Sequence, residues 1–487
     1  MTTTTITVTT PSTSAPHYDH DLIVIGAGSG GVRAARFAAQ RGARVLIVEG
    51  SALGGTCVNV GCIPKKLYSY AAHYGEAFEE AHGFGWGWGA GADAPRFDWS
   101  VLKARRAAEI TRLNGIYDGV LRSAGARLLR GWASLVDAHT VAVRASNGVA
   151  DAPVEHHTAR HIVLATGGQP QPVTGPGAAW AVSSDDMFDL DPFPRRLVVI
   201  GGGYIACEFA SIFNGLGAQV TLVHRGPQLL RGFDAEVAEF ITTEMRKKGI
   251  AVHLHTRLAE VQHAGGVQTL RLNQAGAADA NAADIAVDAD TVLHATGRIA
   301  RTAGLGLEAV GITLNPNGTV PVDAHFQTVV PSVHAIGDLV GHMALTPVAL
   351  AEAMVLVDRL LGDGARPPVD YALIPTAVFT HPNIGTVGLS EEAARARGAV
   401  RIYRTDFKPL QHTLSGSSER VLMKVVVDDA TDRVLGLHMV GCDAGEVIQG
   451  FAAALQAGLT KAQLDRTIGI HPTGAEEFVT MREVSRR

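Results

Sequence analysis

The sequence has few cysteines, no long hydrophobic run and no excess of basic residues. Only four of its 487 residues are cysteine, whereas a secreted domain stapled by disulfides carries more of them in a much shorter chain. No uninterrupted apolar run approaches the roughly 18 residues of a membrane-spanning helix. Lysine and arginine total 42 against 47 acidic residues, a net charge of −5, which argues against a general nucleic-acid-binding protein. We therefore expect neither a membrane nor nucleic acid among its partners.

The N-terminal segment lacks the features of a targeting sequence. Residues 1–16 are mostly threonine, serine and proline, and they contain no arginine, no lysine and no long apolar stretch. A secretory signal needs a positive start and an apolar segment, and a transit peptide is rich in arginine. We expect residues 1–19 to be a disordered tail and the protein to be cytoplasmic.

The rest of the composition is that of a large globular protein. Hydrophobic residues make up 46% of the chain and charged residues 18%, which supplies enough apolar side chain for large cores. The length predicts three or four domains. The 55 glycines indicate many tight turns or close contacts between backbone and ligand.

A strand, a glycine-rich turn, a helix and a second strand follow one another near the N-terminus. The first strand runs into Gly26-x-Gly28-x-x-Gly31, and the second ends at Glu49. In a dinucleotide-binding turn the first glycine permits the tight turn, the second lets the backbone approach a pyrophosphate, and the third allows close helix–strand packing. Glu49 is placed to accept hydrogen bonds from ribose hydroxyls. The pattern predicts a dinucleotide site; an ordinary tight turn is the alternative.

The same pattern returns at Gly201-x-Gly203-x-x-Ala206, but the charge that follows it differs. No acidic residue ends the next strand, and Arg225 and Arg231 come after it instead. A carboxylate there accepts from a free ribose 2′-hydroxyl, whereas arginines bind a 2′-phosphate. We therefore predict that the second site prefers NADPH to NADH. The alternative is that these residues belong to a solvated loop.

Two cysteines, Cys57 and Cys62, lie five residues apart with Gly61 between them. At this spacing they can close a small redox ring at a helix start, which lowers the pKa of a thiol and favours the reactive thiolate. A zinc pair is one alternative, but it needs four ligands, and Cys207 and Cys442 form no second pair at metal spacing. A pair of inert core cysteines is another. We expect Cys207 and Cys442 to be buried structural thiols.

The segment Gly54-Gly-Thr-Cys57-Val-Asn-Val-Gly-Cys62-Ile-Pro-Lys65 resembles the active-site signature of the flavin-dependent pyridine nucleotide–disulfide oxidoreductases. The order of motifs is similar too, since His334-Ala-Ile-Gly-Asp338 and His471-Pro-Thr-Gly-Ala-Glu476 follow the second glycine turn. The similarity extends from about His20 to the end of the chain. It implies FAD and NADPH as cofactors, a redox-active Cys57–Cys62 disulfide and a homodimer.

The resemblance also assigns the domains. It implies an FAD-binding domain at 20–167, an NADPH-binding domain at 168–297, a central segment at 298–371 that completes the FAD domain, and an interface domain at 372–487. The expected fold class is α/β, with two Rossmann-like dinucleotide-binding domains and a C-terminal α+β dimerisation domain. Inside the second domain, residues 275–283 are expected to form a polar hairpin loop.

By the same resemblance, Cys62 is the thiol nearest the flavin and Cys57 attacks the disulfide substrate. Thiol–disulfide exchange needs a proton donor for the leaving thiolate, and histidine titrates near neutral pH. The resemblance implies that His471, oriented by Glu476, is this donor and comes from the other subunit. A histidine–proline pair alone would be read as a surface histidine. Lys65 and Glu208 complete the implied catalytic set as an ion pair beside the flavin.

The cofactor-binding positions implied by the family lie in and around the glycine turns. They are Gly26, Gly28, Ser29, Gly30, Gly31, Glu49, Gly55, Thr56, Lys65, Thr166, Gly167, Gly201, Gly203, Tyr204, Ile205, Glu208, Arg225, Arg231, Gly297, Arg298, Gly337, Asp338 and Thr346. In the family the aspartate at position 338 contacts the ribityl chain of the flavin, and the tyrosine at 204 moves to admit the nicotinamide.

The pair Lys65-Lys66 is typical of family members that reduce glutathione disulfide, which is therefore the expected substrate. Ser29, Arg36 and Tyr117 fall on positions that contact it. Without the resemblance, Arg36 would be a surface helix cation and Tyr117 a core aromatic.

Two residues depart from the pattern of family members that reduce glutathione disulfide. Met354 stands where many such members carry a substrate-binding arginine, and Arg33 stands where some carry alanine. These differences keep related bis-thiol substrates such as trypanothione open. Two competing functions also stay open: a lipoamide dehydrogenase, which would favour NADH, and a non-catalytic flavoprotein that senses nucleotides.

Replacing Arg225 and Arg231 with neutral residues is expected to raise the KM for NADPH far more than the KM for NADH. Each lost charge-assisted hydrogen bond costs roughly 1.5–3 kcal/mol, which is about tenfold or more in affinity. Steady-state kinetics with both nucleotides measure the difference. Equal effects on the two would refute the assignment.

Overall fold

The computed structural model describes residues 17–88, 95–146, 153–274 and 285–487. Its contacts divide the chain into a first unit of Met1–Leu53, Tyr117–Gly167 and Ala300–Pro368, and a second unit of Gly54–Ile116, Gly168–Ile299 and Val369–Arg487. Most of the expected tail, and all of the expected hairpin at 275–283, lie outside the described residues. The domain boundaries proposed from the sequence stay predictions.

The first unit is built on a parallel sheet with strand order β3-β2-β1-β5-β16. Apolar runs such as Leu22–Ile25 form its centre and are buried, as expected for strands covered on both faces. β4 pairs antiparallel with the outer parts of β3 and β5. The strands are β1 His20–Ile25, β2 Val45–Glu49, β3 Arg127–Leu135, β4 Thr140–Ala145, β5 Val154–Leu164 and β16 Val333–Ala335.

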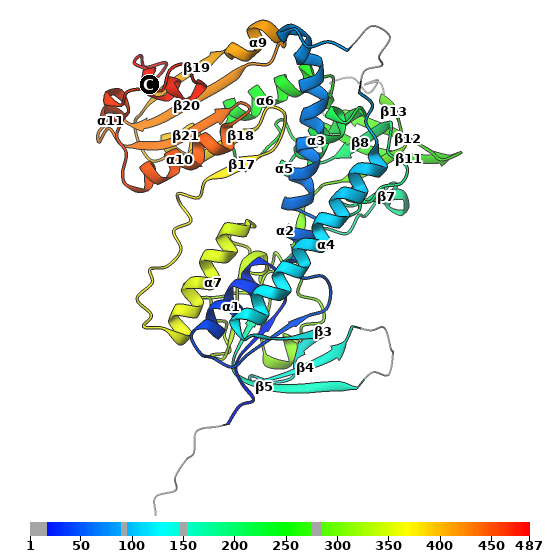
Figure 1. Cartoon of the computed structure of the whole chain (residues 1–487), viewed down its shortest axis with the longest axis vertical. Coiled ribbons are helices and arrows are strands. Elements are labelled where there is room, and N and C mark those ends of the chain that lie inside the picture. The colour runs from blue at the N-terminus through cyan, green and yellow to red at the C-terminus, as the bar shows by residue number, and fades with distance from the viewer. Residues whose placement is uncertain (1–16, 89–94, 147–152, 275–284) are drawn as a thin grey trace, which may run out of the picture. The chain divides into compact units, whose positions relative to one another are not determined.

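Two helices of this unit, α1 (Ser29–Gln40) and α7 (Thr346–Leu361), lie side by side (Figure 1). Little space is left at Gly30, because a Cβ atom there would lie 3.2 Å from Ile336 Cδ1, just after β16, and 3.4 Å from the Cβ of Ala349 on α7. The unit also contains the short 3-10 turns η4 Glu308–Val310 and η5 Gly337–Leu339. The sheet and these helices bring the start of α1 next to the end of β16.

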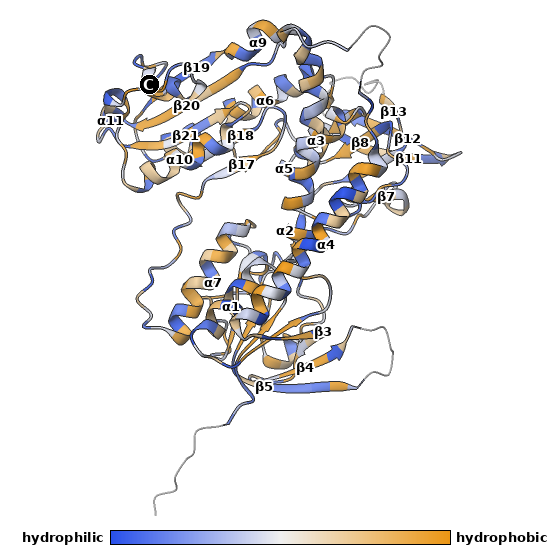
Figure 2. Cartoon of the chain, in the orientation of Figure 1, coloured by the Kyte–Doolittle hydropathy of each residue, from blue (hydrophilic) through white to orange (hydrophobic). Residues whose placement is uncertain are grey.

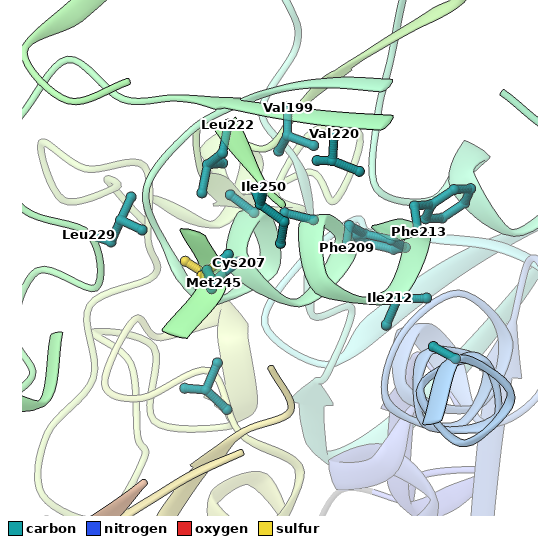
Figure 3. Close-up of a cluster of buried hydrophobic side chains, with 14 of the residues drawn as sticks. Val199, Cys207, Phe209, Ile212, Phe213, Val220, Leu222, Leu229, Met245 and Ile250 are labelled. Carbon is teal, nitrogen blue, oxygen red and sulfur yellow. The ribbon is translucent and has the colours of Figure 1, made fainter. Parts of the chain in front are cut away.

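The second unit contains another parallel sheet, with strand order β10-β9-β8-β14-β7. Figure 3 shows its core around α5, where Cys207, Phe209 and Phe213 pack with side chains of the sheet. A three-stranded antiparallel sheet, β11-β12-β13, and a two-stranded one, β15-β6, accompany it. The elements are β6 Gly168–Pro170, η2 Ala178–Trp180, β7 Ala181–Val182, η3 Asp186–Phe188, β8 Arg196–Ile200, α5 Tyr204–Gly215, β9 Gln219–Val223, α6 Ala235–Lys247, β10 Ala251–His253, β11 Thr256–Ala264, β12 Val267–Gln274, β13 Ile285–Ala289, β14 Thr291–His294 and β15 Arg298–Ala300.

Two helices carry the cysteine segment, which also belongs to the second unit. They are α2 (Gly55–Asn59) and α3 (Cys62–Ala81), and the 3-10 turn η1 (His82–Phe84) follows them. The long helix α4 (Trp99–Ala124) begins in the second unit, and its last turns belong to the first.

The C-terminal part of the second unit is an antiparallel sheet with strand order β17-β18-β21-β20-β19. Strand β20, which lies between β21 and the edge strand β19, is hydrophobic over most of its length (Figure 2) and buried. The elements are β17 Thr376–Val378, β18 Ile384–Gly388, α8 Glu391–Arg395, β19 Val400–Phe407, α9 Leu410–Ser415, β20 Val421–Asp428, β21 Val434–Val440, α10 Ala444–Gln456, α11 Lys461–Arg466, η6 Gly474–Glu476 and α12 Glu477–Thr480. The predicted α/β fold class with an added α+β domain is confirmed.

One cysteine prediction holds and the other is wrong. Cys207 is fully buried in α5, and burial raises the pKa of its thiol. Cys442 is exposed, because it lies in the turn between β21 and α10 rather than inside either element. No helix in the described ranges is long and apolar enough to cross a bilayer.

A buried lysine joins the parallel and antiparallel parts of the second unit. Lys424, on β20, is 1% exposed, and its Nζ lies 2.9 Å from Asp234 Oδ1, 3.1 Å from Glu236 Oε2 and 2.8 Å from Glu391 Oε2. Burial alone would raise the pKa of Glu391, but hydrogen bonds from Arg486 and Lys424 lower it to about 2. The contribution of this carboxylate to stability is therefore complete above about pH 4.5 and is lost as the pH falls toward 2.

Lys424→Met is expected to destabilise the second unit by about 3–5 kcal/mol, because it leaves three carboxylates without their shared buried cation. Thermal unfolding at neutral pH measures the loss. Arg122→Met is the control, since Arg122 pairs with Asp118 only at the surface and should change the midpoint little. Equal midpoints for the Lys424 variant and the wild type would contradict the buried network.

Candidate functional site

The first glycine turn connects β1 to α1 in a geometry that only small residues allow. Gly26 has a φ of 102°, and a Cβ atom on Gly31 would lie 1.9 Å from the Gly26 carbonyl oxygen. Gly28 is the N-cap of α1 and has no side chain to occupy the amide groups of the first turn. These amides form a positively polarised surface that suits a phosphate.

Glu49 ends β2 beside this turn. Its Oε2 accepts a hydrogen bond from the Ala27 amide at 2.6 Å, and its Oε1 accepts one from the Ser51 amide at 2.8 Å. The carboxylate is half-buried and fixed by the backbone at both oxygens. Each oxygen keeps a further lone pair that can accept from a hydroxyl group.

Three loops of the first unit meet because they leave adjacent parallel strands at the same edge. Ile25 of β1 is paired with Leu164 of β5, and Leu164 is paired with Ala335 of β16. The segments that follow these strand ends contain Gly26, Thr166-Gly167 and Gly337-Asp338 respectively. This edge is where ligands bind in open α/β sheets.

The Gly337 loop is held by a fully buried carboxylate. Glu352, on α7, accepts a hydrogen bond from the Gly337 amide at 2.6 Å through Oε2, and its Oε1 lies 3.3 Å from His342 Nδ1. Gly337 has a φ of 75°, and Asp338 beside it is half-buried. Thr166 is fixed in a similar way, since its hydroxyl donates to the Arg301 carbonyl at 2.7 Å. Thr346, the last of the residues expected here, begins α7.

The second glycine turn connects β8 to α5 in the same manner. Gly201 has a φ of 147°, and a Cβ atom there would lie 2.3 Å from the Ala295 carbonyl oxygen. Gly203 is exposed, and a Cβ atom on it would meet nothing within 4 Å. Tyr204 and Ile205 begin α5, and the Tyr204 ring is 39% exposed.

The loop that carries the arginines folds back onto this second turn. Leu230 donates a hydrogen bond to the Gly202 carbonyl at 2.6 Å, which brings the neighbouring Arg231 to the turn. Arg225 and Arg231 are exposed, and neither has an acidic partner among the described residues. Burial and then the charges of both arginines lower the pKa of His224. Positive charge at this place is therefore carried by the arginines.

The cysteine pair spans the junction of α2 and α3. Cys57 is half-buried in α2, and Cys62 is exposed at the first position of α3, the positive end of the helix dipole. Gly61 allows the tight connection, because a Cβ atom there would lie 2.8 Å from the Thr56 carbonyl oxygen. Within the described part of the chain no cluster of three or more metal-ligating side chains is found.

Lys65, one turn after Cys62, forms an ion pair with Glu208 of α5. α3 and α5 approach each other closely because small residues lie at their contact. A Cβ atom on Gly75 would lie 2.8 Å from the Gly215 carbonyl oxygen. The Glu208 side chain is 5% exposed, and the same Oε1 that meets Lys65 accepts the amide of Phe379 at 2.9 Å.

Further expected residues lie in the cysteine segment or contact it. Gly55 has a φ of 59° and begins α2. Arg298 donates to the Gly168 carbonyl at 2.9 Å and reaches the Thr56 hydroxyl at 3.5 Å. Gly297, with a φ of 152°, precedes it and accepts a hydrogen bond from the amide of Gln171 at 3.0 Å. These contacts connect the cysteine segment with the end of the second parallel sheet.

His471 and Glu476 are a hydrogen-bonded pair near the C-terminus. His471 Nδ1 lies 3.1 Å from Glu476 Oε1, and the imidazole is 81% exposed. The Thr473 amide also donates to this carboxylate, as part of a capping box. The carboxylate fixes the ring through Nδ1 and leaves Nε2 directed away from it.

The residues expected to contact substrate are spread over α1 and α4. Ser29 begins α1, and the guanidinium groups of Arg33 and Arg36 lie 5.1 and 5.5 Å from the Phe37 ring centroid. Tyr117, on α4, is half-buried rather than part of the core. Met354 is half-buried on α7.

Comparison with known proteins agrees with this geometry. A family model described as pyridine nucleotide-disulphide oxidoreductase matches residues 20–353, and one described as the dimerisation domain of that group matches residues 374–482. The chain belongs to the pyridine nucleotide-disulphide oxidoreductase family. The resemblance expected from the sequence is thereby confirmed.

Three relatives of this oxidoreductase match over nearly its whole length. Glutathione reductase from Burkholderia cepacia is 45% identical over 466 residues, which is 96% of this chain and 99% of the relative. The chloroplastic/mitochondrial glutathione reductase of Pisum sativum is 44% identical over 97% of this chain and 84% of its own length. Glutathione reductase from Nostoc sp. is 40% identical over 96% of this chain and 100% of its own length.

Sequence reasoning missed two side chains that shape the oxidoreductase site. Glu352 is the first charged residue of the largely apolar helix α7, and a carboxylate on its buried face is a signal for a hydrogen-bonding role. Phe379 offers no such signal, because an aromatic residue after a strand is ordinary core material. Its contact with Glu208 depends on folding that joins residues far apart in the sequence.

Gly31→Ala is expected to destabilise this oxidoreductase, whereas Gly203→Ala is not. The methyl group at 31 would overlap the Gly26 carbonyl. The one at 203 would enter open space, where the pyrophosphate of a dinucleotide could approach the protein backbone. Thermal unfolding and nucleotide titration separate the effects: the first variant should lose several degrees in midpoint, and the second should keep its midpoint and bind nucleotide at least about tenfold more weakly. Similar behaviour of both variants would contradict this difference between the third and the second glycine position of such a turn.

Proposed function

We propose that this chain reduces glutathione disulfide to two molecules of glutathione with NADPH, through bound FAD and the Cys57–Cys62 pair. One observation carries the proposal: Cys62 begins α3 one turn before the Lys65–Glu208 ion pair, in a chain similar to glutathione reductases over nearly its whole length. The reaction consumes one NADPH and one proton for each disulfide.

The two glycine turns fit two different nucleotides. The first turn offers uncapped helix amides for a pyrophosphate, the Glu49 carboxylate for ribose hydroxyls and Asp338 at the adjacent strand end. The second offers an open Gly203 and two exposed arginines, which suits the 2′-phosphate of NADPH. FAD at the first turn supplies the electron-transfer chemistry between NADPH and the cysteine pair.

The cysteines divide the thiol chemistry between them. The Cys57 thiolate attacks one sulfur of glutathione disulfide, forms a mixed disulfide and expels one glutathione thiolate. The Cys62 thiolate then attacks the sulfur of Cys57, restores the Cys57–Cys62 bond and releases the second glutathione. The exposed start of α3 favours the thiolate form at Cys62.

His471 supplies the proton for the leaving glutathione thiolate. Its hydrogen bond to Glu476 holds Nδ1, so Nε2 is the atom that carries the transferred proton. We place this histidine on the partner subunit of a homodimer. The dimerisation-domain match, which covers His471 and Glu476, and the 81% exposure of His471 within its own chain support this placement.

The remaining residues bind and orient. The Lys65–Glu208 pair places a buried positive charge one turn from Cys62. Tyr204, exposed at the start of α5, moves when the nicotinamide enters, and Arg298 helps to hold the nucleotide. Arg36 binds a carboxylate of glutathione, and Ser29 and Tyr117 complete the substrate contacts. The reductive chemistry suits a cytoplasmic location.

Purified protein should oxidise NADPH with glutathione disulfide at least about a hundredfold more efficiently than with lipoamide or trypanothione disulfide, judged by kcat/KM. NADH should be the poorer donor. Preferred use of NADH with lipoamide would instead make the protein a lipoamide dehydrogenase. A yellow protein that oxidises neither nucleotide with any disulfide would favour a nucleotide sensor.

Single substitutions link that activity to the proposed residues. Cys62→Ser should abolish disulfide reduction, and His471→Gln should lower kcat by about 10²–10⁴-fold because the proton donor is lost. Cys442→Ser is the matched control, since Cys442 is an exposed thiol outside the pair, and it should keep wild-type rates. Full activity of Cys62→Ser would exclude the mechanism.

A further inference from the structure

Phe379 touches both members of the Lys65–Glu208 ion pair. Its amide donates to Glu208 Oε1 at 2.9 Å, and the Lys65 ammonium lies 4.5 Å from the centroid of its ring. The Lys66 ammonium lies 3.8 Å from the same centroid. An aromatic face attracts cations within about 6 Å, more strongly when they are desolvated, and the Lys65 side chain is only 14% exposed.

We propose that Phe379 is a positioning residue for the cofactor-side ion pair. Its backbone amide fixes the carboxylate of Glu208, and its ring fixes the ammonium group of Lys65. Without a further contact, the Lys65 ammonium could change its position relative to the Glu208 carboxylate, since it is a point charge on a flexible chain. With Phe379 present, each charge has a second contact that comes from the same residue.

The loop that carries Phe379 is itself fastened to α3. His381 is 7% exposed; its Nε2 lies 3.1 Å from the Ser69 hydroxyl and its Nδ1 lies 3.3 Å from Glu76 Oε1. Ser69 stands one helical turn after Lys65 on the same helix. The Phe379 loop is thus attached to the same helix that carries Lys65.

A second cation completes this attachment. Lys248 Nζ lies 2.8 Å from Glu76 Oε2 and 2.9 Å from Glu419 Oε2. Burial alone would raise the pKa of Glu76, but His381 and Lys248 lower it to about 2, so the carboxylate stays charged at neutral pH. Glu76 therefore keeps at neutral pH the negative charge that His381 and Lys248 contact.

The inference rests on the proposed function in one respect, namely that the ion pair lies beside bound FAD. A displaced Lys65 charge would then change the flavin midpoint potential and kcat, while the KM values for NADPH and glutathione disulfide stay within about twofold. A purely structural role for Phe379 would lower thermal stability without moving the potential.

The test compares Phe379→Leu and Phe379→Met with Phe379→Tyr in the holoenzyme. Leucine and methionine keep the amide and much of the volume but remove the aromatic face, whereas tyrosine keeps it. We expect the first two to lower kcat about three- to tenfold, shift the midpoint potential and raise the acylation rate of Lys65 by a similar factor, and the tyrosine variant to restore all three. Two variants of different flexibility guard against a single one that fails to fold.

The Lys65 acylation rate, read by peptide mass spectrometry, does not depend on which disulfide the enzyme reduces. A wild-type protein inactive toward glutathione disulfide would defeat the proposed function but leave this readout intact. Unchanged Lys65 reactivity and midpoint potential in the folded leucine or methionine variant would overturn the positioning role.

A pair of histidines tests the attachment to α3. His381→Gln should raise Lys65 acylation about threefold, because it loosens the Phe379 loop. His412→Gln is the matched control: His412 is also buried, and its Nε2 lies 3.4 Å from Glu80 Oε1 on the same helix, but it belongs to α9 rather than to the Phe379 loop. Equal Lys65 reactivity in the two variants would show that His381 only stabilises the fold.

Discussion

Three segments of the second unit meet at the carboxylate of Glu208. It is almost completely buried, so its charge must be compensated by hydrogen bonds and an opposite charge. Lys65 comes from the cysteine helix and the amide of Phe379 from the loop that follows β17, while Glu208 itself lies in the helix of the second glycine turn. One desolvated charge thereby obliges three segments, distant in the sequence, to take up one arrangement.

The two glycine turns rest on a different constraint, which is steric. In each, the first glycine adopts a backbone conformation that other residues avoid and faces a carbonyl oxygen of a neighbouring strand end, Ala165 for Gly26 and Ala295 for Gly201. The third position differs: glycine at 31 touches the turn itself, whereas Ala206 is buried and tolerated. Sterics thus build the same βα turn twice, and the choice of ligand is left to the charges around it.

Local constraints of this kind are what made much of the site predictable. The glycine spacing, the cysteine pair at a helix start and the His471–Glu476 pair each involve residues close in the sequence, and the structure forms the expected turn, helix or hydrogen bond at each. The α/β fold follows from the alternating apolar strands and helices. Strand β19 was not expected, because Arg401 and Arg404 interrupt its apolar residues and its buried side becomes evident only when it pairs with β20.

Contacts between distant segments could not be read in the same way. Cys442 follows an apolar strand, and this pattern indicated burial, but the chain turns outward at that residue before α10 begins. Phe379 and Glu352 matter through hydrogen bonds to an α5 carboxylate and to the Gly337 amide, and neither partner is near in the sequence. Such residues become recognisable only when burial is known, since an unpaired buried charge or amide requires a partner.

The proposed preference of the second turn for a 2′-phosphate should not depend on pH, because arginine rather than histidine supplies the positive charge. His224 stands closest to the turn, where its ring occupies the space next to Gly202, but burial and the two arginines lower its pKa. Below neutral pH a histidine in that place would otherwise gain charge and make nucleotide affinity pH-dependent. Arginine does not lose its proton in proteins, so the positive charge that is proposed to face the 2′-phosphate does not vary with pH. The lowered pKa of His224 therefore separates the proposed selection of the nucleotide from the proton transfer proposed for His471.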